Sequence, residues 1–348
     1  MNILPEWQEL SQKIANKPGL ALLIGASDSG KTTLAKYLLK SWTEKGLKVA
    51  FVDCDMGQST LGPPGTMGMR LFDQSYREHE LFKFTRDLSL YFIGSFSPVG
   101  HLLQTLTGVN ILVRKAQQLH PDIILVDTTG LVFGGVGEHL KYRKVELLRP
   151  NYVVLIQKGD ELEHFNHFLS RSGATIYKLK AAEEANRRSP EARRQYRIAR
   201  LKDYFYNAGV HRIPFPQLII WGTNPFAGVP LNEEDLRFCS TILEGRILYG
   251  EKGGQNLFLV KKDFVSIRHR DTLKAKYNVT NIHITNIYWY DHRLVALYNA
   301  RGEIETIAVI KHWDLAAHKI QVLGHLTDIY RVRTMEIGKE NVRDLLKL

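Results

Sequence analysis

The chain has 348 residues, 44% of them hydrophobic, which is enough to bury a sizeable core and predicts two domains rather than one. No apolar run approaches the roughly 20 residues that cross a bilayer, and residues 1–18 have no apolar signal-peptide core, so we expect a cytoplasmic protein with no membrane partner. The two cysteines support neither a disulfide framework nor a cysteine-rich zinc site, and the formal net charge of +11 suits a polyanionic partner.

The N-terminal segment, residues 1–19, is predicted to form a short helix. Pro5 suits the first helical position. Trp7, Leu10 and Ile14 recur at helical spacing and give the helix one apolar face. We therefore expect this helix to pack on the protein core.

A phosphate-binding loop follows, placed between a strand and a helix. An apolar strand is predicted over residues 20–24 and a helix over residues 33–44, and between them the sequence reads G-x-x-x-x-G-K-T. Glycines let the backbone N–H groups wrap around phosphate oxygens, while Lys31 adds a cation and the Thr32 hydroxyl a Mg²⁺ ligand. The loop predicts binding of a nucleoside triphosphate. The residues expected to bind it are Gly25, Ala26, Ser27, Asp28, Ser29, Gly30, Lys31, Thr32 and Thr33.

Further apolar runs alternate with helical patterns over much of the chain. These runs lie at residues 49–52, 90–93, 123–126 and 153–156. Alternation of this kind predicts an α/β fold of the P-loop kinase type over residues 20–221, with a parallel sheet and helices on both faces. After residue 221 the pattern changes to short β-rich runs separated by turns, which predicts a smaller β-rich domain over residues 222–348, built as a barrel or sandwich.

Acidic residues stand directly after two of these strands. Asp53 and Asp55 follow the second strand, where a carboxylate can hold Mg²⁺, accept a proton from an attacking hydroxyl, or simply cap the next turn. Asp127 ends a later strand after four apolar residues, as does the second metal-site acid of phosphate-loop enzymes, so we expect it in a Mg²⁺ shell. The next residues, Thr-Thr-Gly at 128–130, add hydroxyls that suit contact with a substrate.

Taken in order, these motifs resemble the Clp1/Grc3 family of polynucleotide 5′-hydroxyl kinases. The resemblance is carried by the phosphate loop, D-x-D-x-G-Q at residues 53–58, P-G-T-M-G at 64–68, D-T-T-G at 127–130, R-R-Q-Y-R at 193–197 and D-Y-F-Y at 203–206. The R-R-Q-Y-R motif belongs to a basic cluster made of Arg187, Arg188, Arg193, Arg194, Arg197, Arg200 and Lys202. It implies transfer of the γ-phosphate of ATP, or of GTP, to the 5′-hydroxyl end of RNA or DNA. The alternative is a catalytically silent ATP-binding scaffold of an RNA-processing complex.

The resemblance also implies roles for individual residues. Lys31 would steady the β- and γ-phosphates, Asp55 would accept the proton of the 5′-hydroxyl, and Gln58 would help hold the nucleotide or a metal-bound water. Residues 183–206 would form a lid whose Arg193 and Arg197, one turn apart, neutralise charge on the phosphoryl group. The expected catalytic residues are Lys31, Asp55, Arg193 and Arg197; the expected metal ligands are Thr32, Asp55 and Asp127; the expected substrate contacts are Ser97, Thr128, Thr129 and Gly130.

Two positions depart from the family pattern. The family has a tryptophan after T-x-G that stacks on the terminal base, and here that position holds Leu131, with Phe133 close enough to replace it. The loop at residues 94–101, which contains Ser97, takes the place of the family's substrate loop with different residues. A His164-x-x-His167 pair nearby in the chain is expected to be surface composition rather than a zinc site.

Overall fold

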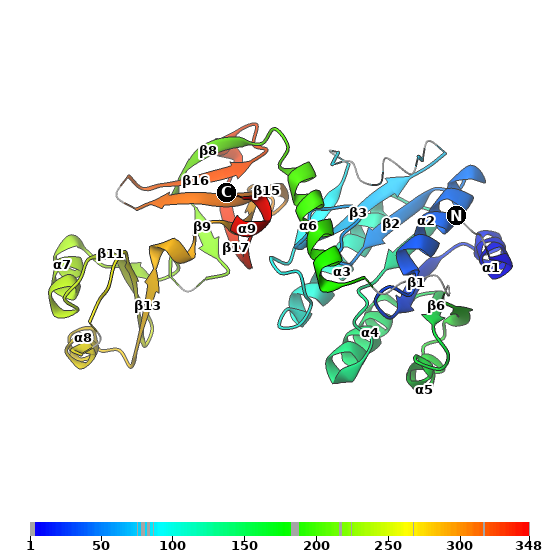
Figure 1. The fold of residues 1–348 in the computed structure, drawn as a ribbon, viewed down its shortest axis with the longest axis horizontal. Helices are drawn as coiled ribbons and strands as arrows, with labels where there is room; N and C mark the ends of the chain where they lie inside the picture. Colours follow the sequence, from blue (N-terminus) through cyan, green and yellow to red (C-terminus); the bar gives the residue numbers. More distant parts are fainter. Residues whose placement is uncertain are drawn as a thin grey trace. The chain divides into compact units, whose positions relative to one another are not determined.

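The chain forms two compact units, Met1–Tyr204 and Phe205–Leu348 (Figure 1). The computed structural model describes residues 4–347 except 75, 78–80, 82, 83, 86, 182–187, 216, 217, 224, 267 and 316. The division lies earlier than the expected boundary after residue 221. The reason is that strands β8 (Gly209–Pro214) and β9 (Ile219–Trp221) pair with strands of the second unit.

The first unit is built on a seven-stranded sheet with the order β4-β3-β2-β5-β1-β6-β7. Five neighbouring strands, β2, β5, β1, β6 and β7, run parallel, as the alternating pattern predicts. At one edge the sheet also contains an antiparallel part, where β3 pairs with β2 and with β4. The strands are β1 (Leu20–Gly25), β2 (Val49–Asp53), β3 (Thr66–Phe72), β4 (Ser89–Phe92), β5 (Ile123–Asp127), β6 (Tyr152–Gln157) and β7 (Thr175–Lys180).

Helices cover both faces of this sheet, as predicted. Helices α1 and α2 pack on one face through Trp7, Leu38 and Trp42. Helices α3, α4 and α5 pack on the other face with residues such as Leu112 and Val145. The helices of the first unit are α1 (Pro5–Asn16), α2 (Lys31–Glu44), α3 (Leu102–Gln118), α4 (Gly134–Leu148), α5 (Asn166–Leu169) and α6 (Pro190–Tyr204), with a 3₁₀ turn η2 at Glu163–Phe165.

The carboxyl ends of three central strands bring the chemical motifs together. Strand β1 ends at Gly25, where the phosphate loop begins, and strand β5 beside it ends at Asp127. Strand β2 lies on the other side of β5, and its last residue, Asp53, stands opposite Asp127 in the parallel register. Ligands of such sheets bind outside the carboxyl ends of the strands, so this edge positions the candidate site.

The second unit contains two sheets rather than one barrel. Its six-stranded sheet has the order β8-β16-β15-β14-β17-β9, and its four-stranded sheet has the order β10-β11-β12-β13. One hydrophobic cluster surrounds Trp313 and a second surrounds Leu257, and the first also includes Val260 of the four-stranded sheet. The remaining elements are β10 (Val229–Pro230), α7 (Glu233–Ile242), β11 (Ile247–Gly253), β12 (Asn256–Lys261), α8 (Arg270–Tyr277), β13 (Asn281–Asn286), η4 (Ile287–Trp289), β14 (Arg293–Tyr298), β15 (Ile304–Asp314), β16 (Lys319–Gly324), η5 (Ile329–Arg331), β17 (Thr334–Asn341) and α9 (Arg343–Leu346).

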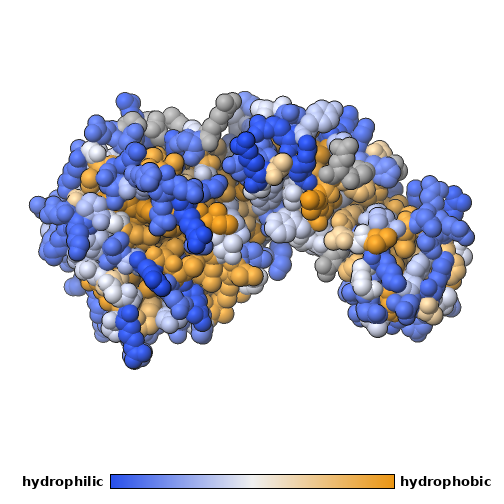
Figure 2. All heavy atoms as spheres, turned by 180° about the vertical axis from the view of Figure 1, so that it is seen from behind, coloured by the Kyte–Doolittle hydropathy of each residue, from blue (hydrophilic) through white to orange (hydrophobic). Residues whose placement is uncertain are grey.

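The surface of the first unit mixes strongly hydrophilic side chains with hydrophobic ones, as Figure 2 shows for one face. Among the described residues no helix is long and apolar enough to cross a membrane. Several large hydrophobic side chains are nevertheless exposed, including Leu103, Phe133, Val136 and Tyr142.

Candidate active site

The phosphate loop has the geometry that its sequence predicts. Gly30 takes a left-handed backbone conformation, with φ of 94°, directly before helix α2 begins at Lys31. The Lys31 side chain is buried, and its Nζ donates to the carbonyl oxygen of Ala26 at 2.6 Å. Burial lowers the pKa of Lys31, and the nearby carboxylate of Asp127 opposes this shift. The cation is therefore held against the loop that would wrap around the phosphates.

Thr32 and Asp127 form a pair at the start of α2 and the end of β5. The Thr32 hydroxyl donates to Asp127 Oδ2 at 2.7 Å. The second carboxylate oxygen, Oδ1, is buried and has no hydrogen-bond partner among the described residues. Burial raises the pKa of Asp127, whereas Lys31 and the Thr32 hydrogen bond act to lower it. A buried, unpaired carboxylate oxygen beside a hydroxyl is a donor set that suits Mg²⁺.

Asp53 and Asp55 have different environments although they stand two residues apart. Asp53 is buried, and its carboxylate accepts from the N–H groups of residues 55, 60 and 61 and from the Ser59 hydroxyl. Burial and the charge of Asp127 raise the pKa of Asp53 to about 7. Asp53 thus folds the following segment, which is the capping role left open by the sequence.

Asp55 instead faces the cavity of the site. Its Oδ1 accepts from the N–H groups of Gly57 and Gln58, each at 3.0 Å, which fixes the orientation of the carboxylate. Gly57 allows a close approach here, because a Cβ at this position would lie 2.6 Å from the Phe96 carbonyl oxygen. Of the two acids, Asp55 is therefore the one placed to contact a ligand.

The arginine-rich helix α6 contacts the phosphate loop through charged groups. Arg193 Nη2 of the helix lies 2.7 Å from Asp28 Oδ2, and the backbone N–H of Arg188, just before the helix, donates to the same oxygen at 3.0 Å. Arg188 also donates to Gln58 Oε1 at 2.8 Å. Asp28 of the loop therefore joins the helix to the nucleotide side of the site. Arg187 and the beginning of the expected lid lie outside the described residues.

Two further residues of α6 anchor the helix on the segment that follows Asp55. The Tyr196 hydroxyl donates to the Ser59 carbonyl at 3.0 Å, and burial raises the pKa of this tyrosine to about 12. Arg200 is 4% exposed and donates to the carbonyl oxygens of Thr60 and Gly62 at 3.0 and 3.4 Å. The sequence shows Arg200 only as one more member of a basic cluster. Its place three residues after Arg197 on the same helix face is the signal that it packs inward.

A cavity of about 600 Å³ brings most of the predicted site residues together. It is lined by residues from the phosphate loop, from the segment after β2, from the loop that contains Ser97, from the end of β5 and from α6. Residues of the expected site that line it are Ser27, Asp28, Ser29, Gly30, Lys31, Thr32, Thr33, Asp55, Gln58, Ser97, Thr129, Gly130, Arg193 and Arg197. The guanidinium of Arg197 lies 5.2 Å from the centre of the Phe96 ring, which also lines the cavity.

Thr128 departs from its expected position. It is buried, and its hydroxyl donates to the Leu23 carbonyl at 2.8 Å and accepts from Lys141 Nζ at 2.7 Å. This hydroxyl belongs to the interior, because its only proton is used inside the core. Thr129 and Gly130 reach the cavity instead.

Lys141 is a buried residue of the site that the sequence reasoning missed. Besides Thr128, its Nζ donates to the Thr129 carbonyl at 2.6 Å, so one amine ties both residues to helix α4. The signal was present in the helical pattern, since Lys141 and Lys144 fall among the buried residues Leu140 and Val145 on one face of α4.

Gly130 packs directly on the phosphate loop. A Cβ at Gly130 would lie 2.2 Å from Ser27 Oγ and 2.5 Å from the Ser27 backbone. The position therefore admits only glycine without movement of one loop. Among the described residues, no three His, Cys, Asp or Glu side chains cluster as a metal site.

Comparisons with known proteins place the chain in a family. Residues 25–207 match the family model described as the P-loop of mRNA cleavage and polyadenylation factor CLP1. A polyribonucleotide 5′-hydroxyl-kinase of Methanocaldococcus jannaschii is 29% identical over 332 residues, 95% of this chain and 89% of that protein. One of Pyrococcus furiosus is 29% identical over 347 residues, 98% of this chain and 93% of that protein.

A solved structure shares the fold. A chain of the wild-type Clp1p–Pcf11p complex superposes with a TM-score of 0.61 at 15% identity, covering 96% of this chain and 78% of the other. At this identity the likeness concerns the fold alone. It extends over both units of the present chain, since the covered share exceeds either unit.

Proposed function

Because the chain belongs to the CLP1 P-loop family, we propose that it is a polynucleotide 5′-hydroxyl kinase, which transfers the γ-phosphate of ATP or GTP to the 5′-hydroxyl end of RNA or DNA. The names of the archaeal relatives, polyribonucleotide 5′-hydroxyl-kinases, support this activity. The carrying observation is the position of Asp55. Its oriented carboxylate shares one cavity with Lys31, Thr32 and the lid arginines.

Asp55 provides the general base of the proposed reaction. A hydroxyl is a weak nucleophile, and a positioned carboxylate that accepts its proton assists attack on phosphorus. The two N–H groups that hold Oδ1 fix the direction of the carboxylate before the acceptor arrives. Ser97, Thr129 and Gly130, which line the same cavity, are proposed to contact the acceptor end.

The nucleotide side of the site is assigned to the phosphate loop. Its backbone N–H groups and Lys31 bind the phosphates, and the N-terminal end of α2 adds a favourable dipole. Thr32 and Asp127 are proposed to hold Mg²⁺, with the unpaired Oδ1 of Asp127 available as a ligand or as acceptor of a metal-bound water. When bound, the cation neutralises charge on the phosphates.

The lid arginines complete the charge balance. Arg193 is held by Asp28 of the phosphate loop, and Arg197 lies beside Phe96 at the acceptor side. Their guanidinium groups, one helical turn apart, are proposed to stabilise the charge that spreads over the transferred phosphoryl group. Tyr196 and Arg200 keep the helix docked while this occurs.

The test is transfer of labelled γ-phosphate to matched 5′-hydroxyl RNA and DNA oligonucleotides. We expect wild-type protein to label at least one of them, and Asp55→Asn and Lys31→Ala to lose at least 100-fold in kcat, the order seen when one transition-state contact is removed. Asp263→Asn and Lys40→Ala, at exposed positions that do not line the cavity, are the matched controls and should keep full activity.

Replacing ATP by GTP and RNA by DNA in the same assay names the preferred substrates. Wild-type protein that binds ATP and labels no end would refute the kinase and leave an ATP-binding scaffold. Activity that survives Asp55→Asn with kcat unchanged would remove Asp55 from the mechanism while leaving the activity itself in place.

A further inference from the structure

A second cavity lies in the first unit, outside the candidate active site. Its volume is about 310 Å³, and it is formed between α4 and the segment η2–α5. We call it the aromatic pocket. It is lined by Glu138, His139, Tyr142, Arg143, His164, Phe165 and Phe168. Nothing in the proposed phosphate transfer uses these residues.

The rings of this pocket continue from the acceptor side of the active site. Leu131 lines the active-site cavity, and two residues later the Phe133 ring lies 6.3 Å from the His164 ring. From His164 the centroid distances run 4.2 Å to Phe165 and 5.4 Å from Phe165 to Phe168. Phe168 then meets Tyr142 edge to face at 5.1 Å. A series of ring contacts thus leads into the pocket from Phe133, which follows the cavity-lining Leu131 by two residues.

The pocket is accessible and carries polar groups beside its rings. Tyr142 is 38% exposed and Phe133 is 53% exposed, so both rings offer open faces. The Arg143 guanidinium lies 5.4 Å from the Tyr142 ring centre and also pairs with Glu146 Oε2 at 2.6 Å, so it places a cation beside the ring whose charge is shared with an acid. His139 and His164, both exposed, add ring nitrogens that donate or accept hydrogen bonds. Exposed aromatic rings with nearby cations are the features that bind nucleobases in single strands.

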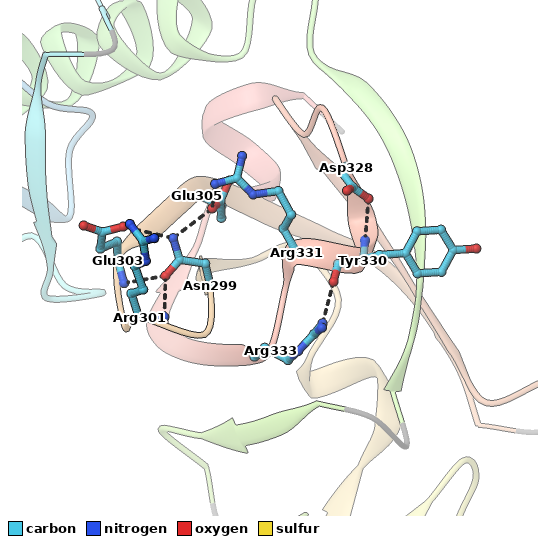
Figure 3. Close-up of polar contacts among 8 residues, drawn as sticks. All are labelled: Asn299, Arg301, Glu303, Glu305, Asp328, Tyr330, Arg331 and Arg333. Atoms are coloured by element: carbon cyan, nitrogen blue, oxygen red, sulfur yellow. Dashed lines mark hydrogen bonds and ion pairs between the residues drawn. The ribbon is translucent and has the colours of Figure 1, made fainter.

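Tyr330 of the second unit is an exposed aromatic ring outside the aromatic pocket. In Figure 3 Tyr330 points away from a network of arginines and acids around the β14–β15 turn. Arg331 pairs with Glu305 at 2.9 Å, and Arg333 donates to the Tyr330 carbonyl. Arg331 and Arg333 are engaged by these contacts, and Tyr330 therefore serves as a control ring outside the aromatic pocket.

We propose that the aromatic pocket binds one base of the polynucleotide substrate, downstream of the nucleotide whose 5′-hydroxyl is phosphorylated. The proposal rests on the kinase function and assigns a further part of the substrate to a place on the protein. Tyr142 lies eight residues beyond the first residue of α4, about 12 Å along the helix. Because α4 begins three residues after Leu131 of the active-site cavity, we assign to the pocket a base about three or four positions from the 5′ end, at about 3.4 Å per stacked nucleotide along these 12 Å.

The test couples a change in the protein to a change in the substrate. A set of 5′-hydroxyl tetranucleotides and hexanucleotides, each with one abasic position, is assayed with wild-type protein and with Tyr142→Leu. We expect the abasic site at position three or four to raise KM about 5- to 100-fold with wild type, the range of one base–aromatic stack. With Tyr142→Leu the KM of the intact substrate should rise by the same factor. An abasic site at position three or four should then raise KM by twofold or less beyond that.

Controls separate this effect from folding and from chemistry. His164→Leu, a second exposed ring of the pocket, should give the same coupling, and Tyr330→Leu in the second unit should give none. kcat with a dinucleotide, which is too short to reach the pocket, should not change in any of these variants. Thermal unfolding midpoints confirm that the variants are folded.

The possible outcomes distinguish failure of the pocket assignment from failure of the proposed kinase function. If the abasic site raises KM by the same factor with wild type and with Tyr142→Leu, the pocket assignment is overturned. The kinase function would stand, and the pocket would serve another kind of partner. Absence of labelling of every oligonucleotide by wild type would overturn the kinase, and with it this inference.

Discussion

Lys141→Met tests whether a residue buried behind the site controls its geometry. Methionine keeps an unbranched chain of similar length but cannot donate a hydrogen bond. Lys141 is fully buried, and its Nζ donates to Thr128 Oγ1 and to the Thr129 carbonyl at 2.7 and 2.6 Å. Burial, together with the charges of Lys144 and Lys31, lowers the pKa of Lys141 well below its ordinary value.

The magnitude follows from those two hydrogen bonds. Each contributes about 1 kcal/mol net, so their loss costs about 2 kcal/mol, which corresponds to about 30-fold in a rate or binding constant. The lost hydrogen bonds hold residues 128–130 in position, and Thr129 and Gly130 of this segment line the cavity. We expect kcat/KM for the 5′-hydroxyl acceptor to fall about 30-fold, with a much smaller change in KM for ATP because Lys31 and Thr32 belong to another segment.

Lys144→Met is the matched control within the same helix. Lys144 is also fully buried, but its Nζ has no hydrogen-bond partner among the described residues. Replacing Lys144 by Met removes the desolvation cost of a buried amine without removing a hydrogen bond. The free energy of unfolding should therefore rise, and kinase activity should persist. Steady-state kinetics with varied acceptor at saturating ATP, and urea unfolding, measure both effects. Equal loss of activity in Lys141→Met and Lys144→Met would refute the positioning argument.

Three further predictions concern other contacts. Gly130→Ala forces a methyl group within 2.5 Å of Ser27 and should lower phosphate transfer at least tenfold in the labelling assay, whereas Gly135→Ala meets nothing within 4 Å and should be neutral. Arg200→Leu removes two hydrogen bonds that dock the lid and should raise KM for ATP by about tenfold, measured by initial rates. Hydrogen bonds lower the pKa of Glu163 to about 2, so its contribution to stability is complete above about pH 4.5 and is lost as pH falls toward 2. The difference in the free energy of unfolding between wild type and Glu163→Gln, measured with urea, should therefore be larger at pH 7 than at pH 3.

The parts of the site that are continuous in sequence could be predicted. The phosphate loop depends on residues that are neighbours in the chain, because strand, glycine turn and helix follow one another directly. Asp127 was likewise placed by its position at the end of an apolar strand, and it lies beside Thr32 as expected. The parallel part of the sheet follows from the alternation of strands and helices.

Features of the site that depend on contacts between distant segments could not be predicted from residue patterns alone. Asp53 and Asp55 have equivalent positions in sequence, and only the folding back of residues 59–61 buries the first and leaves the second in the cavity. Thr128 and Thr129 differ for the same reason, since Lys141 of α4 engages the Thr128 hydroxyl. Strand β3 was recognised only as a motif, because its P-G-T-M-G residues carry no alternating pattern.

The arginines of helix α6 show why net charge alone cannot assign a role. Arg193, Arg197 and Arg200 stand at intervals of four and three residues, which places them on one face of the helix. Their partners change along that face, from Asp28 of the phosphate loop through the Phe96 ring to the backbone of residues 60–62. The same type of side chain docks the helix at one end, and at the other end it is proposed to neutralise charge on the phosphoryl group. Because the docked end is fixed by buried hydrogen bonds, the positions of the other two guanidinium groups follow from the rigidity of the helix between them.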